Sequence, residues 1–161
     1  MTPTQRRLEY TSGYLALGML NEASDELEKI EGDARMSAEV MELRVDLYHQ
    51  AKDWELLLAV AKELARLCPK EKQGWISWAY ALRELERVKE AQDVLLKSES
   101  MHGESSAVLH YNLACYACLL GDMDEAKRRL STACRMDSEF RKSALDDKDL
   151  SGMWDDIAAM K

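Results

Sequence analysis

The sequence contains few residues that interrupt helices and no pattern that specifies strands. It has only 2 prolines and 7 glycines in 161 residues, while 47% of the residues are hydrophobic. Runs that alternate apolar and polar residues, which are typical of half-buried strands, are absent. This composition is typical of a folded, helix-rich chain rather than a disordered one, and together with the missing strand pattern it predicts an all-α protein with a substantial core.

Long apolar runs are also missing. The longest ones, such as 56–61, are far shorter than the roughly 20 residues that span a bilayer. The polar N-terminal residues do not resemble a signal peptide. We therefore expect a soluble cytoplasmic protein in which the four cysteines are reduced thiols.

Positive charge is in deficit. The chain has 22 lysines and arginines against 30 acidic residues, a formal net charge of −8. This balance opposes general attraction to nucleic acid or to an anionic membrane, so neither is an expected partner. The basic residues at 127–129, 135 and 141–142 are interpreted as a solvated helix face, because no aromatic residues for base stacking lie among them.

Sequence motifs of common enzymes are absent as well. There is no HExxH motif, no phosphate-binding glycine loop and no nucleophile elbow. Cys115 and Cys118 are one helical turn apart, but no second Cys/His pair with zinc-site spacing accompanies them. We predict a protein without enzymatic activity, metal or cofactor. A metal or redox role of the two cysteines is a weaker alternative.

A repeat is the most informative feature that is present. Ala23, Leu57, Ala91 and Ala126 each follow a turn, at steps of about 34, 34 and 35 residues. Such a period is typical of stacked helical hairpins. The predicted helices, joined by short links, are about 4–17, 20–32, 38–51, 54–67, 72–85, 88–100, 106–120 and 123–136, with two short helices after 138 and 151.

The last of these units carries a family resemblance. It contains Tyr111-Asn112-Leu113-Ala114 and then Gly121-Asp122-Met123-Asp124-Glu125-Ala126, and it resembles a tetratricopeptide repeat. The resemblance implies a right-handed α-superhelical solenoid of antiparallel hairpins in a single domain, residues 1–161. The repeats are about 4–37, 38–71, 72–106 and 107–140, and 141–161 form a capping segment. The second repeat diverges most, with Val45, Leu57 and Leu64 where small residues are usual.

The family's groove is formed by the first helix of each repeat, so the resemblance implies candidate ligand-binding residues. On these helices, i, i+4, i+7 spacing defines one face. The candidates are Leu8, Ser12, Glu42, Asp46, His49, Ile76, Tyr80, Arg83, Tyr111, Asn112, Cys115 and Cys118. The alternative is that several of them only pack between helices.

These features predict a scaffold that binds a peptide or helix of a partner protein. Asn112 matches one position of the subgroup that clamps chaperone tails, but Glu9, Leu43 and Ser77 occupy the equivalent positions, so that ligand is not expected. The alternative is a homodimer that uses Trp54, Leu57 and Leu58 or the C-terminal helix.

The C-terminal segment is predicted to cap the array. An amphipathic helix with Leu150, Met153, Trp154 and Ile157 on its apolar face is expected there. We expect Ser151 to cap the N-terminus of that helix and Trp154 to be buried. The alternative is a tail that engages a partner.

Overall fold

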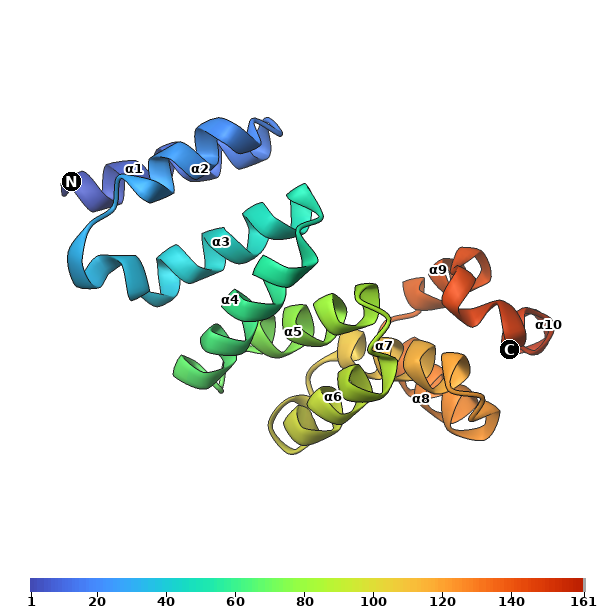
Figure 1. Cartoon of the computed structure of the whole chain (residues 1–161). Helices are drawn as coiled ribbons and strands as arrows, with labels where there is room; N and C mark the ends of the chain where they lie inside the picture. Colours follow the sequence, from blue (N-terminus) through green and yellow to red (C-terminus); the bar gives the residue numbers. More distant parts are fainter. Residues whose placement is uncertain (161) are drawn as a thin grey trace. The chain divides into compact units, whose positions relative to one another are not determined.

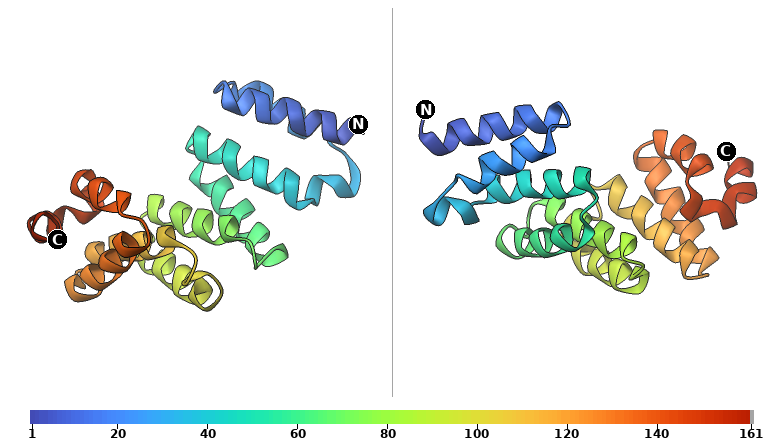
Figure 2. Two further views of the ribbon diagram at one scale, coloured as in Figure 1. Left: turned by 180° about the vertical axis from the view of Figure 1, so that it is seen from behind. Right: turned by 45° about the horizontal axis from the view of Figure 1, so that its top comes forward.

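The computed structural model describes residues 1–160 and contains only helices within them. Figures 1 and 2 show these elements, and Lys161 lies outside the described residues. The α-helices are α1 (Pro3–Ala16), α2 (Leu20–Glu28), α3 (Ala38–Ala51), α4 (Trp54–Leu67), α5 (Lys72–Glu84), α6 (Val88–His102), α7 (Ala107–Leu119), α8 (Met123–Met136), α9 (Glu139–Asp146) and α10 (Trp154–Ala159). Two 3₁₀ helices are η1 (Gly32–Met36) and η2 (Lys148–Met153).

The chain divides into two compact units. The N-terminal unit is Met1–Ala81 and the C-terminal unit begins at Leu82, so the division falls inside α5. In the N-terminal unit, α1 packs beside α2 and α3 beside α4 (Figures 1 and 2). In the C-terminal unit, α7 packs against α6, α8 and η2.

The repeat period has a local physical cause at the turns between helices. Gly18, Lys52, Glu86 and Gly121 all have left-handed backbone, with φ of 71°, 55°, 62° and 83°. Their spacing reproduces the step of the repeat. A left-handed residue satisfies the last carbonyls of a helix and reverses the chain. At Asp53 and Asp122 the side chain then caps the following helix, accepting hydrogen bonds from the amides of Leu56 and Glu125.

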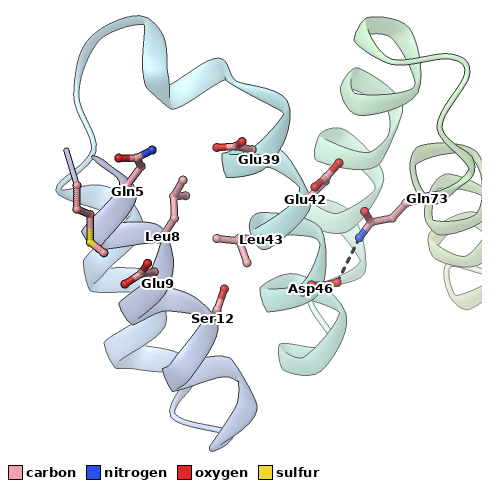
Figure 3. Close-up of a pocket in the computed structure, with 10 residues that line it drawn as sticks. Gln5, Leu8, Glu9, Ser12, Glu39, Glu42, Leu43, Asp46 and Gln73 are labelled. Atoms are coloured by element: carbon pink, nitrogen blue, oxygen red, sulfur yellow. Dashed lines mark hydrogen bonds between the residues drawn. The ribbon is translucent and has the colours of Figure 1, made fainter. Parts of the chain in front are cut away.

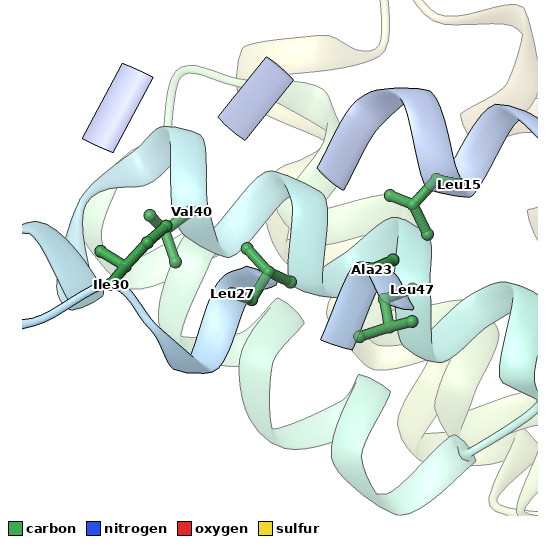
Figure 4. Packing of buried hydrophobic residues seen from close by; sticks show 6 residues of the cluster. All are labelled: Leu15, Ala23, Leu27, Ile30, Val40 and Leu47. Carbon is green, nitrogen blue, oxygen red and sulfur yellow. The ribbon is translucent and has the colours of Figure 1, made fainter. Parts of the chain in front are cut away.

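Two apolar clusters form the core of the N-terminal unit. The first combines Leu15, Ala23, Leu27, Ile30, Val40 and Leu47 from α1, α2, α3 and the turn after α2 (Figure 4). The second contains Met41, Val45, Leu57, Ala61, Leu64 and Ala81. The bulky residues of the divergent repeat are therefore core. The backbones of α4 and α5 approach each other closely at Gly74, where an added Cβ would lie 2.6 Å from the backbone nitrogen of Ala65.

A charged network crosses the interior of the C-terminal unit. Arg129 is only 4% exposed, and its guanidinium contacts Glu99 and donates to Glu125 at 2.7 Å. Arg129 also bonds Nδ1 of His110, whose Nε2 lies 2.7 Å from the carbonyl of Gly103. The buried charge is thus paired, as buried charges must be. The interpretation of residues 127–129 as a solvated helix face is wrong at Arg129.

The end of the chain differs from the predicted cap in two respects. Ser151 lies within η2, and α10 begins at Trp154 without a side-chain cap. Trp154 is 37% exposed, and its indole N–H donates to the carbonyls of Ala144 and Asp147 at 3.1 Å. These hydrogen bonds satisfy the indole nitrogen, and the prediction that Trp154 is buried is wrong. Leu150, Met153 and Ile157 are buried.

Candidate functional site

A groove of about 810 Å³ opens between α1 and α3 of the N-terminal unit (Figure 3). The residues that line it are Met1, Gln5, Leu8, Glu9, Ser12, Glu39, Glu42, Leu43, Asp46 and Gln73. Leu8 and Leu43 point toward each other across its floor (Figure 3), and both pack against the first core cluster. The groove therefore has an apolar floor and polar walls.

Helical periodicity explains why these side chains share one surface. Gln5, Leu8, Glu9 and Ser12 follow i, i+3, i+4, i+7 spacing on α1. Glu39, Glu42, Leu43 and Asp46 repeat the same spacing on α3. Residues with this spacing lie on one face of a helix. The groove is thus formed by two matching helix faces that α2 and α4 do not cover.

The walls of the groove are acidic. Glu9, Glu39, Glu42 and Asp46 contribute carboxylates, and among residues 1–160 no lysine, arginine or histidine side chain lines it. Gln73 donates to Asp46 at 3.3 Å. Desolvation by the surrounding protein raises the pKa of Asp46, and His49 partly offsets that shift. A carboxylate that is partly desolvated and held near others gains from an incoming cation.

Four of the twelve candidate residues line this groove: Leu8, Ser12, Glu42 and Asp46. His49 and Tyr80 do not. They form an aromatic cluster with Trp54, in which the rings of His49 and Tyr80 are 4.9 Å apart. Ile76 is half-buried on α5.

Several groove residues were not predicted as such from the sequence: Gln5, Glu9, Glu39, Leu43 and Gln73. Each of them lies one helical turn from, or next to, a candidate, and Gln73 is three residues before Ile76 on α5. Spacing of i, i+3, i+4, i+7 that starts at Gln5, Glu39 or Gln73 includes all of them.

Candidates in the C-terminal unit lie under the chain's own C-terminal segment. Tyr111, Cys115 and Cys118 are buried on α7, and Asn112 beside them is half-buried. The Tyr111 hydroxyl donates to Asp147 at 2.7 Å, and its ring stacks on Phe140 with 4.7 Å between centroids. Tyr111, Cys115 and Cys118 therefore already have partners within the chain.

Arg83 also binds this segment. Its Nε and terminal nitrogen donate to the two carboxylate oxygens of Asp149 at 2.8 and 2.6 Å. This bidentate geometry is the strongest form of the arginine–carboxylate pair. Hydrogen bonding to Asp149 raises the pKa of Arg83 further above its ordinary value.

The surroundings of the two thiols of α7 disfavour the reactive thiolate form. Burial raises the pKa of Cys115, and the nearby carboxylates of Asp147 and Asp149 raise it further. Burial also raises the pKa of Cys118. A thiol must ionise to bind metal or attack, so both shifts oppose such chemistry. Within residues 1–160, no group of three or more His, Cys, Asp or Glu side chains is placed to hold a metal ion.

The basic residues near α8 and α9 form a further surface that could attract a partner. The exposed bases Lys127, Arg128 and Lys142 pair with Asp156, Glu125 and Glu139, respectively. Most of the basic surface near α8 and α9 is thus neutralised locally. Among the helices formed by residues 1–160, none combines the length and apolar character that crossing a bilayer requires.

Comparison with solved structures identifies the fold. MamA MSR-1 is similar with a TM-score of 0.72 and 20% identity, over 84% of this chain and 78% of that chain. TTC0263, a thermophilic TPR protein in Thermus thermophilus, is similar with a TM-score of 0.72 and 19% identity, over 96% of this chain and 82% of that chain. The fold is therefore all-α and tetratricopeptide-like, as predicted.

Sequence comparisons add no closer relationship. No protein-family model matches the chain. No curated protein matches its sequence. The single domain and the count of four repeats stay predictions, and at these identities the solved structures show the fold alone.

Proposed function

We propose that the protein is a non-enzymatic scaffold whose N-terminal groove binds a positively charged peptide segment of a partner protein. The acidic walls of the groove around an apolar floor carry this proposal. Lysine and arginine side chains place charge at their tips and apolar methylenes along their stems. Such a segment can satisfy Glu9 and Glu42 while its stems cover Leu8 and Leu43.

The energetics favour binding of modest strength. Exposed ion pairs each contribute at most about 1 kcal/mol. Contact with the floor supplies about 25 cal/mol per Å² of apolar surface removed from water. Charge therefore gives selectivity and fast association, whereas the leucines of the floor give much of the affinity.

Selection from a library of 12-residue peptides on the immobilised chain tests this proposal. We expect lysine- and arginine-rich peptides to be enriched, and fluorescence anisotropy to give a Kd that weakens as salt is raised. Changing Glu9→Gln together with Glu42→Gln should weaken binding of a selected peptide about tenfold.

The matched control is Glu31→Gln with Glu55→Gln. Both are exposed acids of the same unit outside the groove, and the change in net charge is identical. Equal weakening by both pairs would show attraction to net charge alone and would refute binding in the groove.

Self-association is the second candidate. Leu57, which the sequence offered for a dimer surface, is fully buried, and Trp54 and Leu58 pack partly on the core. A separate observation favours association: Met36 and Leu56 are exposed beside a hollow of about 310 Å³ that they help to line. Mass measured against concentration by analytical ultracentrifugation decides. A strict monomer at high concentration excludes this candidate.

A further inference from the structure

The C-terminal unit contains a peptide-like contact between one of its helix faces and its own C-terminal segment, here defined as residues 147–152. By the repeat register, Tyr111 on α7 corresponds to the open groove positions Leu8 and Glu42, and Cys115 corresponds to Ser12 and Asp46. In α7 this face is covered by η2, whose residues form most of the segment.

Side-chain carboxylates make the polar contacts. Asp147 accepts from the Tyr111 hydroxyl at 2.7 Å and from the Cys115 thiol at 3.8 Å. Asp149 accepts the bidentate pair from Arg83. The two acids thus accept hydrogen bonds from two separate groups: the hydroxyl of Tyr111 binds Asp147, and the guanidinium of Arg83 binds Asp149.

Packing of the segment against the helix face adds to these polar contacts. Leu150 is fully buried, while Lys148 and Ser151 between the contact positions face solvent. Gly152 is exposed, and an added Cβ there would lie 3.5 Å from the Cys118 sulfur, an ordinary contact, and 3.2 Å from the terminal methyl carbon of Met123, which can shift. The contacts therefore define a pattern Asp-x-Asp-Leu, in which the two acids and the leucine contact the helix face and the residue between the acids faces solvent.

We propose that this face of α7, with Arg83, is a recognition site for an acidic segment of this pattern, and that the C-terminal segment is an exchangeable occupant that an acidic partner segment displaces. The site is distinct from the N-terminal groove and does not depend on the function proposed for it. A tethered occupant acts at an effective concentration of about millimolar. The resting chain therefore excludes weak acidic ligands.

The test uses the full chain and thiol alkylation followed by mass spectrometry. The double change Asp147→Asn with Asp149→Asn keeps side-chain size but removes both charges. We expect Cys115 and Cys118 to react about tenfold faster in this variant, equivalent to about 1.4 kcal/mol of easier opening. Cys68 and Cys134 lie outside the contact and serve as internal references.

A synthetic peptide with the sequence of residues 145–157 is then added. It should restore protection of the two thiols in the double variant and leave the unchanged chain unaffected. The same peptide with asparagine at both acid positions should not restore protection. Arg83→Gln in the double variant should weaken the effect of the peptide.

Two results would overturn the proposal. Unchanged alkylation in a folded double variant means that the carboxylates do not hold the segment. Faster alkylation that no concentration of peptide reverses means that the segment is a fixed cap. If the double variant loses its helical circular dichroism, Asp149→Asn alone carries the test, and loss of helix there too would equally show a structural role.

Discussion

The two units treat equivalent helix faces in opposite ways. In the N-terminal unit the faces of α1 and α3 remain open as an acidic groove. In the C-terminal unit the corresponding face of α7 is covered by residues 147–152, through Tyr111 and Cys115. The same repeat position can thus be a ligand surface or a core surface. The deciding factor is whether another part of the chain supplies complementary groups.

The difference extends to composition. On this face α1 has the polar side chains of Glu9 and Ser12, which water solvates well. α7 instead is buried on nearly all sides, with Tyr111, Cys115, Tyr116 and Cys118 among its covered residues. A helix that is apolar all round requires cover, whereas a helix with one polar face does not.

The largest expected effect comes from shortening one leucine side chain in each unit. Leu150→Ala should lower the free energy of unfolding by about 2–5 kcal/mol, because Leu150 is fully buried and a cavity remains. Leu8→Ala should cost about 1 kcal/mol or less, because this side chain is only partly buried at the groove floor. Urea denaturation measures both. Equal costs would contradict the distinction between an open and a covered face.

A smaller effect is expected when pH is lowered: the free energy of unfolding should fall because of Glu125 in the C-terminal unit and rise because of Asp46 in the N-terminal unit. Hydrogen bonds from Arg128, and from Arg129, lower the pKa of Glu125 to about 2. Its contribution to stability is complete above the ordinary carboxyl pKa and is lost as pH falls through about 2. Because Glu125 is partly exposed and solvent screens its ion pairs, Glu125→Gln should cost only about 1 kcal/mol at pH 7 and much less near pH 2.

Asp46 in the groove should behave in the reverse way. Its pKa is raised by desolvation, so its charged form is the less favourable one in the folded chain. The chain gains stability from this group as pH falls through the raised pKa. Asp46→Asn should leave stability at pH 7 unchanged or slightly higher. Urea denaturation at a series of pH values checks both variants, and a clear loss with Asp46→Asn would contradict the assigned cause.

The smallest expected effects concern the turns. Lys52 in the N-terminal unit and Glu86 in the C-terminal unit have left-handed backbone, which costs a residue with a Cβ about 1–2 kcal/mol. Lys52→Gly and Glu86→Gly should each stabilise by only up to about 1 kcal/mol, since glycine loses more entropy on folding. Thermal unfolding measures the gain. The matched control is Gly121→Ala, where φ is 83° and the same change in reverse should destabilise.

Much of the fold followed from the sequence. The predicted helices 38–51 and 54–67 agree with α3 and α4, because capping residues and helical periodicity act within a few residues. The helix predicted for 20–32 ends earlier, at Glu28, since the chain continues through Gly32 into η1. Local signals located the elements and left some ends uncertain.

The functional surfaces were predictable only in part. Leu8, Ser12, Glu42 and Asp46 line the groove because their helix face follows directly from the repeat register. The fate of Tyr111 did not follow, because its partner Asp147 is 36 residues away in the chain. No periodicity relates those two positions.

By itself, the sequence determined an all-α chain with a regular step, a set of helix faces and an excess of acidic groups. These properties depend on backbone preferences and on contacts within about one helical turn. Only the tertiary structure decided which faces are open and which are closed. The pairing of Arg83 with Asp149 joins residues 66 positions apart, so it depends on the path of the folded chain and on burial of Leu150, and no local pattern encodes it.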